Sequence, residues 1–361
     1  YGINQRRIWT AETDRTGAIA ETISRDKDLT KSLLQACGVP VPIGQAVDSA
    51  TEAWSVAQEL GLPVVVKPSD GNHGRGVFTN LSTQQEIEQA YGVAVQEGSG
   101  VLVERFILGQ EHRLLVVGGK LIAAAKGAYA QVTGNGVSAI HTLIDTQLNA
   151  DPRRGHEEDQ PLNYVRLDSA AQLEIARQGY TPQTILPNGE HAIIQRNGNV
   201  AIDCTELVHP EVAALACTAA RVVGLDIAGI DLVALDISKP LQQQGGAIVE
   251  VNAGPGLLMH LKPAAGKPRQ VGRDIVAHSF ALGDMARVPV IGITGSKGKT
   301  ITGKLLFRLL TLHGWRCGLA CSDGLFVDKR LLHRGDCANF ENARRVLMNR
   351  EVQTAVIENG A

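Results

Sequence analysis

The sequence predicts a multidomain protein of α/β and α+β architecture. Short apolar runs alternate with amphipathic helical segments along all 361 residues, which is typical of chains that combine sheets and helices. That length allows two or three domains, and a composition of 44% hydrophobic and 20% charged residues is ordinary for a globular protein. A net charge of −2 gives no positive field for nucleic acid or an anionic membrane, so we expect neither as a partner. No apolar run reaches the roughly 18 residues of a membrane-spanning helix.

The expected elements before residue 285 follow from apolar periodicity and from the glycines and prolines that interrupt it. Gly38 and Pro40 stop the first helix, and Gly118 and Gly119 form the turn of a hairpin. Residues 151–160, DPRRGHEEDQ, are polar and predict a loop. The elements expected are, in order, a helix at 26–36, a buried strand at 62–67, a glycine loop at 71–76, a strand at 101–104, the hairpin at 114–123, an alanine-rich helix at 210–223, and strands at 227–235 and 247–252.

A break in composition over residues 281–289 places a domain boundary near residue 285. Beyond it, an apolar run at 288–291 precedes a glycine-rich loop, a helix is expected at 301–312 and a strand at 354–358. The expected domains are 1–24, the end of an amino-terminal domain or a linker, 25–284, a first domain, and 285–361, the truncated start of a second. The chain opens on Tyr1 without a methionine or a signal-peptide pattern, so we expect it to be an internal piece of a longer protein.

The first candidate site lies in VVVKPSDGNHGRGV, residues 64–77. A strand delivers Lys67 at its end, and the loop that follows contains three glycines. Small residues let backbone N–H groups approach phosphate oxygens, to which Lys67, His73 and Arg75 would add positive charge. The sequence therefore indicates a phosphate-binding loop, with an ordinary glycine-rich hairpin turn as the alternative.

Polar residues at the ends of apolar strands suggest a metal site downstream of this loop. Asp231 lies within an apolar strand, and Glu250 and Asn252 end another. A carboxylate in an apolar strand is costly unless a partner compensates it, and a Mg²⁺ ion shared with nucleotide phosphates prefers such oxygen ligands. Glu104 ends a further strand, and Glu111 follows seven residues later. Each residue alone is more often a satisfied polar group at a strand end, but their combined order favours a magnesium–nucleotide site.

The order of these residues resembles that of the ATP-grasp superfamily over residues 25–280. The resemblance implies an ATP-grasp fold that forms carbon–nitrogen bonds through an acyl phosphate, with ATP and Mg²⁺. Some members carry an arginine two residues before the metal aspartate, where this chain has Gly229, so Arg113 or His73 is expected to supply charge at the acyl phosphate. The other implied contacts are Lys27 and Lys67 with the α and β phosphates, Glu104 and the neighbouring backbone with adenine, Glu111 with the ribose, and Asp231, Glu250 and Asn252 with the metal.

Longer phrases resemble the central part of the cyanophycin synthetase family, whose members build a poly-aspartate backbone bearing arginine on each side chain. The phrases are YGINQRRIW, DGNHGRGV, EHRLLVVGGKLIAAA, DPRRG, LDIAGIDLV, DISKPL and VEVNAGPGLLMHLKPAAGKPRQV. The resemblance implies an ATP-grasp domain followed by a partial P-loop domain like that of Mur ligases, each with its own ATP. The implied partners are L-aspartate, L-arginine and a cyanophycin primer or growing polymer, handled by a cytoplasmic homo-oligomer, a dimer or tetramer.

One departure from that family concerns Val200 and Ala201. Members usually carry a short Ser-Thr-Gly-Gly segment at this point, where the growing polymer end binds, whereas Val200 runs directly into Ala201. Either the chain lacks this segment or the sequence omits it, and omission is favoured because mobile glycine loops often escape observation.

The second candidate site is GITGSKGKT, residues 292–300, whose ending is typical of a Walker phosphate loop. Lys299 would reach the β and γ oxygens and Thr300 would ligate Mg²⁺. Ile293 stands where the strict pattern needs glycine, but the form G-x-T-G-x-x-G-K-T resembles that of Mur ligases. Glu358, at the end of the strand at 354–358, matches a magnesium ligand of that family, with a surface glutamate as an equal alternative. The residues implied to hold this second ATP are Gly295, Ser296, Lys297, Gly298, Lys299 and Thr300.

Three alternative functions stay open. A related synthetase polymerises finished β-aspartyl-arginine dipeptides with only its ATP-grasp site active. A generic dipeptide or D-alanine ligase would lack the appended phosphate-loop domain. A non-catalytic nucleotide-binding module would keep the fold without the chemistry.

Six cysteines give no metal signature. Cys317 and Cys321 form a C-x3-C pair, but no second pair of Cys or His accompanies them at zinc-site spacing. We therefore expect buried free thiols, as in a reducing cytoplasm.

Overall fold

The computed structural model describes residues 1–69, 76–155, 160, 162–280, 282–284 and 286–360, and divides the chain into two compact units. The long unit is Ile8–Ile275, and the split unit joins Tyr1–Arg7 to Val276–Ala361. The division falls within α10 (Val271–Ser279), upstream of the boundary expected near residue 285. In the part of the chain that is described, helices are too short or too polar to cross a membrane.

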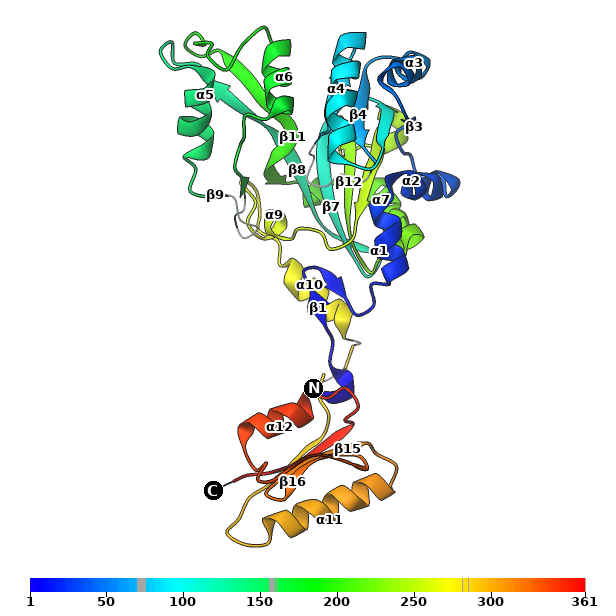
Figure 1. Ribbon diagram of the computed structural model, residues 1–361, viewed down its shortest axis with the longest axis vertical. Coiled ribbons are helices and arrows are strands. Elements are labelled where there is room, and N and C mark those ends of the chain that lie inside the picture. Colours follow the sequence, from blue (N-terminus) through cyan, green and yellow to red (C-terminus); the bar gives the residue numbers. More distant parts are fainter. Residues whose placement is uncertain (70–75, 156–159, 161, 281, 285, 361) are drawn as a thin grey trace. The chain divides into compact units, whose positions relative to one another are not determined.

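The first sheet of the long unit has the order β3-β6-β4-β5 and is antiparallel throughout, with strands Gly44–Val47, Val101–Arg105, Val64–Pro68 and Phe78–Leu81. Helices α3 (Ala50–Leu60) and α4 (Gln84–Glu97) cover one face of it (Figure 1), where their alanines pack against Val66 and Val103. Because side chains alternate across a strand, the next residues, Lys67 and Glu104, point to the opposite face. The strands expected at 62–67 and 101–104 are confirmed with slightly shifted ends.

The second sheet has the order β11-β8-β7-β12-β13 and is also antiparallel, with strands His191–Asp203, Lys120–Thr133, Gln110–Val117, Ile227–Ala234 and Ala247–Asn252. Helix α7 (Pro210–Val223) packs its alanines against Leu114 and Ile230 on one face. Arg113 and Asp231, the chain neighbours of those residues, therefore point to the other face. The hairpin, the alanine-rich helix and the strands expected for this region are confirmed.

Helix ends in the long unit follow local sequence signals. Helix α2 (Lys27–Ala36) begins after Asp26, whose side chain accepts a hydrogen bond from the Leu29 N–H. Helix α4 begins with a capping box, in which the Thr83 side chain and the Glu86 side chain each bond the other's backbone N–H. The helix predicted at 26–36 is thus confirmed, with its first residue acting as the cap.

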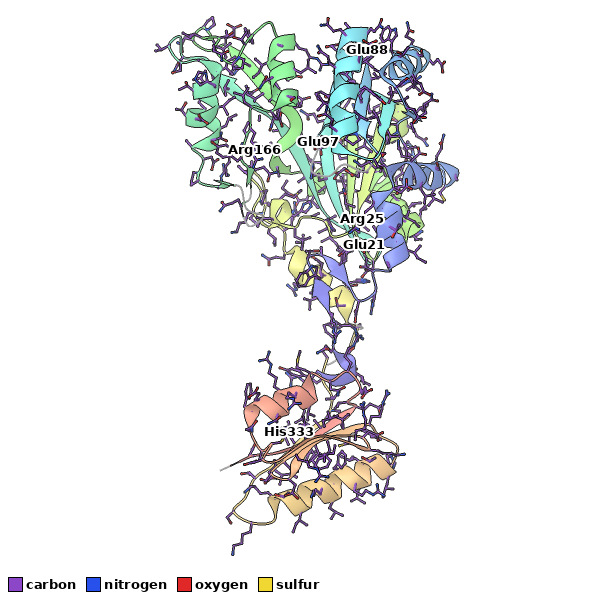
Figure 2. The ribbon with its side chains drawn as sticks, in the orientation of Figure 1. Glu21, Arg25, Glu88, Glu97, Arg166 and His333 are labelled. Carbon is purple, nitrogen blue, oxygen red and sulfur yellow. The ribbon has the colours of Figure 1, made fainter. Side chains whose placement is uncertain are left out.

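A third core joins β8 and β11 to α5 (Ile140–Leu143) and α6 (Ser169–Arg177). Within the predicted loop at 151–160, Arg154–Gly155 forms strand β9 and pairs in parallel with β10 (Leu162–Asn163), so the prediction is wrong at those two residues. Glu21 and Arg25 lie one turn apart on α1 (Ala18–Arg25) and form an ion pair (Figure 2). The remaining short elements of the long unit are β1 Ile8–Trp9, β2 Glu12–Thr13, η2 Ile144–Asn149, η3 Thr205–Leu207, α8 Leu241–Gln244 and α9 Leu258–Leu261.

The split unit is an α/β layer structure around a mixed sheet of order β14-β18-β15-β16-β17, with strands Val290–Ile293, Thr354–Glu358, Cys317–Cys321, Gly324–Val327 and Arg330–Arg334. The first three in this order run parallel. Helix α11 (Lys299–Leu312) packs on the face that carries Leu319, and α12 (Phe340–Leu347) on the face that carries Ala320. From the start of the chain, η1 (Gly2–Asn4) joins this unit, where the Ile3 N–H donates to the Val352 carbonyl at 2.9 Å. The expected elements at 301–312 and 354–358 are confirmed.

The six cysteines are free thiols, as expected, but they are not all buried. Cys204, Cys317, Cys321 and Cys337 are buried, Cys217 is half-buried and Cys37 is exposed. Burial raises the pKa of Cys204 and of Cys317 to about 12, so both thiols stay protonated at neutral pH. Cys37 contradicts the expectation because it follows directly on the last residue of α2, at a helix end that faces solvent.

Candidate functional site

Glu104 is the centre of a buried ion cluster on the first sheet, on the face opposite α3 and α4. Its Oε2 lies 2.8 Å from Lys67 Nζ, and its Oε1 accepts a hydrogen bond from Lys31 Nζ. Only 2% of Glu104 and 7% of each lysine are exposed. Burial opposes the ionisation of Glu104, but Lys67 and then Lys31 outweigh it and lower its pKa. Glu104 is therefore ionised, and two lysine side chains lie beside its single negative charge.

A second charged group forms a row across three strands of the second sheet. Asp231 of β12 lies directly opposite Arg113 of β7 and Glu250 of β13. Arg113 donates to Glu111 Oε1 from Nε at 3.1 Å and from Nη2 at 2.7 Å, and its Nη2 lies 4.0 Å from Asp231 Oδ2. Like charges directly opposite each other on a sheet are unfavourable. The pairing of Asp231 with Glu250 therefore calls for positive charge.

The pKa of Asp231 reflects this excess of negative charge. Burial raises its pKa, Arg113 opposes the rise, and Glu111 and Glu250 add to it. Arg113 responds in the opposite sense, since Asp231 raises the guanidinium pKa. A further cation beside Asp231 would relieve the repulsion that Arg113 leaves in place.

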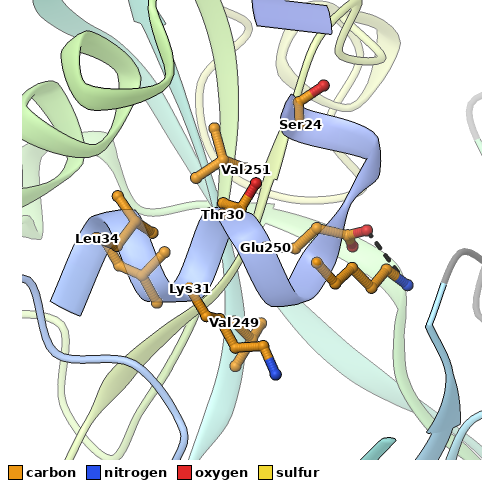
Figure 3. A pocket seen from close by; sticks show the side chains of 9 residues that line it. Ser24, Thr30, Lys31, Leu34, Val249, Glu250 and Val251 are labelled. Atoms are coloured by element: carbon orange, nitrogen blue, oxygen red, sulfur yellow. Dashed lines mark ion pairs between the residues drawn. The ribbon is translucent and has the colours of Figure 1, made fainter. Parts of the chain in front are cut away.

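Helix α2 reaches this row from the side. Lys27 Nζ lies 3.6 Å from Glu250 Oε1, and Figure 3 marks the ion pair with a dashed line. The cavity beside it, between α2 and β13, measures about 10 Å³. That is room for about one water molecule, so this cavity is too small for a nucleotide. The same helix supplies Lys31 to Glu104, so α2 contacts the charged clusters of both sheets.

The second candidate loop joins β14 to α11 in the split unit. Lys299 Nζ donates to the Gly295 carbonyl at 2.8 Å, and Thr300 Oγ1 donates to Glu358 Oε1 at 3.1 Å. Glu358 is 2% exposed and also accepts from the N–H and the hydroxyl of Ser322, each at 3.0 Å. It ends β18, the parallel neighbour of β14. Lys299, Thr300 and Glu358 thus meet at the carboxyl ends of parallel strands, where open α/β sheets bind ligands.

The remaining expected site residues fall into three groups. Asn252 lies opposite Gly229 at the end of β13, next to the row described above. Gly295, Ser296, Lys297 and Gly298 are exposed in the loop before α11. His73 and most of the first glycine loop lie outside the described residues. Strand β11 pairs with β8 on both sides of the suspected omission, with Val200 opposite Ala128 and Ala201 opposite Gly127.

A magnesium ion would fit the chemistry of the row in the second sheet. Among the described side chains, three or more His, Cys, Asp or Glu do not gather as a metal cage. Two carboxylates and the amide oxygen of Asn252 are nevertheless the hard oxygen donors that Mg²⁺ takes, and Mg²⁺ usually completes its shell with water and phosphate.

Lys31 is a site residue that the sequence did not reveal. On an amphipathic helix a lysine usually faces solvent, and its partner Glu104 lies 73 positions away. A weak signal existed, because Lys31 follows the candidate Lys27 by one helical turn and so shares its face.

Comparisons with known proteins identify several to which this chain is similar. Residues 26–117 match the family described as "Carbamoyl-phosphate synthase L chain, ATP binding domain". A cyanophycin synthetase of Trichormus variabilis is 38% identical over 364 residues, which cover 99% of this chain and 40% of the relative. The bifunctional glutathione biosynthesis protein of Streptococcus mutans is 31% identical over 280 residues, 74% of this chain and 37% of the relative. Among solved structures, a bifunctional glutathione synthetase from Pasteurella multocida has a TM-score of 0.49 and 27% identity, covering 74% of this chain and 37% of that one.

The two antiparallel sheets, together with the family match, define an ATP-grasp fold in the long unit. Over 99% of its length the chain is similar to cyanophycin synthetases, so both resemblances inferred from the sequence are confirmed. It spans about 40% of the length of the curated relatives that it matches.

Proposed function

We propose that the protein carrying this chain is an ATP-dependent carbon–nitrogen ligase with the activity named in its relatives, the synthesis of cyanophycin. In this proposal the ATP-grasp site adds L-aspartate to the polymer backbone, and the split unit adds L-arginine to the new aspartate side chain. The observation that carries the first step is the pairing of Asp231 with Glu250 in direct register on adjacent strands, beside Lys27 and Arg113.

The first site would bind ATP and Mg²⁺. Asp231, Glu250 and Asn252 would hold the metal, which when bound neutralises charge on the phosphates of ATP. Lys27 and Lys67 would contact the α and β phosphates, Glu104 the adenine and Glu111 the ribose. Lys67 supports this role because it shares the face of the first sheet with Glu104 and is held in a defined position.

The first reaction would proceed in two displacements. A carboxylate oxygen at the polymer's C-terminus attacks the γ phosphorus of ATP, the bond to the β-phosphate oxygen breaks, and ADP leaves. The amine of aspartate then attacks the carbonyl carbon of the acyl phosphate, phosphate leaves with the bonding electron pair, and the amine loses a proton. Arg113 would stabilise negative charge on the acyl phosphate or the substrate carboxylate, with His73 as the other candidate.

The second reaction would repeat this chemistry on the side-chain carboxylate, with arginine as the amine. The arrangement of Lys299, Thr300 and Glu358 supports a phosphate-binding role for the split unit, since strand, loop and helix follow in the order of a P-loop. A Mur-ligase-like domain and arginine addition are therefore part of the proposal. Thr300 and Glu358 would hold the metal of this site.

The cell compartment and partners follow from the same proposal. Free cysteines suit a reducing cytoplasm. The small-molecule partners would be L-aspartate and L-arginine, and the macromolecular partner a primer or growing polymer. Assembly as a homo-oligomer, a dimer or tetramer, is also proposed.

The test is incorporation of labelled aspartate and labelled arginine into acid-insoluble product, with ATP, Mg²⁺ and a short polymer primer. Incorporation of both in equal amounts supports two working sites. In Asp231→Ala we expect both incorporations to stop, because arginine addition needs a fresh aspartate. In Lys299→Ala we expect arginine addition to stop while the first aspartate is still added. Polymerisation of the aspartyl-arginine dipeptide alone would mean that only the first site works, and no incorporation of any kind would refute the ligase.

A further inference from the structure

Lys27 and Lys31 lie one turn apart on α2, and each meets a carboxylate from a different sheet. Lys27 faces Glu250 of β13 at 3.6 Å, and Lys31 donates to Glu104 of β6. A lysine that is 7% exposed is rare unless it is paired. Lys31 is therefore buried as the ion-pair partner of Glu104. The proposed chemistry gives Lys31 itself no part.

Glu104 has two ammonium partners where one would neutralise it. Lys67 Nζ lies 2.8 Å from one oxygen and Lys31 occupies the other. A phosphate that recruits Lys67 would take away one partner of a carboxylate that is 2% exposed. Leaving a buried charge unpaired is strongly unfavourable, so ATP would have to compete with Glu104 for Lys67.

We propose that Lys31 is a positioning residue that keeps Glu104 paired while Lys67 turns to the phosphates of ATP. This inference rests on the proposed function of the ATP-grasp site. Two features of α2 suit the task. Asp26 caps the helix, and Leu34, 1% exposed, anchors it in the core, so the Lys31 backbone is fixed. Lys31 acts only through Glu104, and its removal should matter only while that carboxylate is present.

The experiment measures binding of a non-hydrolysable ATP analogue with Mg²⁺ by calorimetry. All variants carry Lys299→Ala, so that the signal comes from the ATP-grasp site. We expect Lys31→Met to raise the Kd by about 10- to 100-fold, the range for a lost hydrogen bond to a charged group. Lys31→Arg, which keeps the charge, should recover most of the affinity. Lys239→Met, a matched lysine in an exposed ion pair with Asp236, should bind like the parent.

A double variant separates positioning from a general structural role. In a Glu104→Gln background, adding Lys31→Met should leave the Kd unchanged, because no carboxylate remains to be held. An equal loss in both backgrounds overturns the inference, as does a Lys31→Met protein that binds like the parent. If Lys31→Met alone fails to fold, the double variant decides, since it removes both partners of the buried pair. If the parent does not bind the analogue, the proposed ATP site itself is refuted. If the parent binds and Lys31→Met binds equally well, only the inference about Lys31 is refuted.

Discussion

At the scale of single residues, Asp231 is a position that locally destabilises the long unit. Its carboxylate is 7% exposed, and Glu250 stands directly opposite on the next strand. Packing would favour an apolar side chain here, as at the neighbouring Ile230 and Leu232. Arg113 offsets part of the charge and is itself partly exposed. Residues that break the local pattern in this way are typical of functional sites.

Replacement of Asp231 by Asn should stabilise the ligand-free protein. The substitution removes a buried carboxylate whose pKa is raised by burial and by its acidic neighbours. We expect a gain of about 1–3 kcal/mol in the free energy of unfolding at pH 8. The gain should shrink as the pH falls toward the ordinary range of a carboxyl group, because the folded parent then holds a proton there. Urea unfolding at several pH values measures it, and a loss of stability at pH 8 would contradict the assignment.

His260 should make the long unit less stable in acid. Burial lowers its pKa to about 4; the negative charge of Asp203 acts to raise this pKa, and the positive charge of Arg113 lowers it further. The unfolded chain binds the proton near pH 6.5, so the folded state loses stability as the pH falls from 6.5 to 4. We expect His260→Gln to remove up to about 3 kcal/mol of that loss. The exposed His141→Gln is the control, and identical pH slopes for His260→Gln and the parent would be inconsistent with a buried neutral imidazole.

At the scale of elements, the N-terminal end of α4 connects two parts of the long unit. The first turn of α4 is closed by Thr83 and Glu86, and Glu86 also accepts from Arg177 of α6 at 2.9 Å. Arg177 donates in addition to the Thr79 carbonyl at 2.7 Å. One helix terminus thereby ties the first sheet to the third core.

Loss of the Thr83 side chain should weaken this terminus. We expect Thr83→Ala to lower the free energy of unfolding by about 1 kcal/mol, the usual value of a helix cap. Ser82→Ala is the matched control, because Ser82 contacts Glu86 only through its backbone N–H. Glu86→Ala should cost more than Thr83→Ala, since it also removes the carboxylate that lies 2.9 Å from Arg177 Nε and leaves Glu174, at 3.8 Å, as the carboxylate partner of Arg177 among the described residues. Denaturant unfolding that ranks Thr83→Ala with Ser82→Ala would contradict the capping box.

Elements whose ends are marked by proline or glycine could be predicted from the sequence, and pairings between distant residues could not. Helix α7 and strand β13 were predicted to the residue, since Pro210 and Gly224 mark the ends of the helix and Gly246 precedes the strand. The pairing of Lys31 with Glu104 could not be predicted from the four-residue spacing of Lys27 and Lys31 alone, because it depends on how α2 packs against the first sheet. Strand β9 was not predicted because two residues are too few to show the alternation of apolar and polar side chains that indicates a strand. Of the expected site, the residues around Asp231 lie together because β7, β12 and β13 are adjacent strands whose register pairs Asp231 with Arg113 and Glu250.

At the scale of the whole molecule, the two ends of the chain build one unit. Gly2 is buried with φ 60°, and a Cβ there would lie 2.3 Å from the Val352 carbonyl oxygen. Asn4 Nδ2 donates to the Arg287 carbonyl at 2.7 Å. The first residues are therefore a structural part of the split unit, a role that a seven-residue segment without periodicity could not announce in the sequence.

Deletion of residues 1–7 should destabilise the split unit selectively. The deletion exposes Val288 and Val352 and removes the hydrogen bonds that Ile3 and Asn4 make. We expect a lower midpoint for the thermal transition of the split unit, by several degrees, and no change for the long unit. Calorimetry with limited proteolysis assigns the transitions. Gly318→Ala is a positive control for that assignment, because its Cβ would lie 2.4 Å from Val346 Cγ1 in the same unit. A shift confined to the long unit would refute this description.

The joined ends also fix an order of events during synthesis on the ribosome. Residues 1–7 emerge before the long unit, but their partners between Val276 and Ala361 emerge only after the whole long unit has been translated. The long unit can therefore complete its sheets while the opening segment is still without its partners. The ATP-grasp fold of the long unit therefore has all of its residues before the segment Val276–Ala361 is complete.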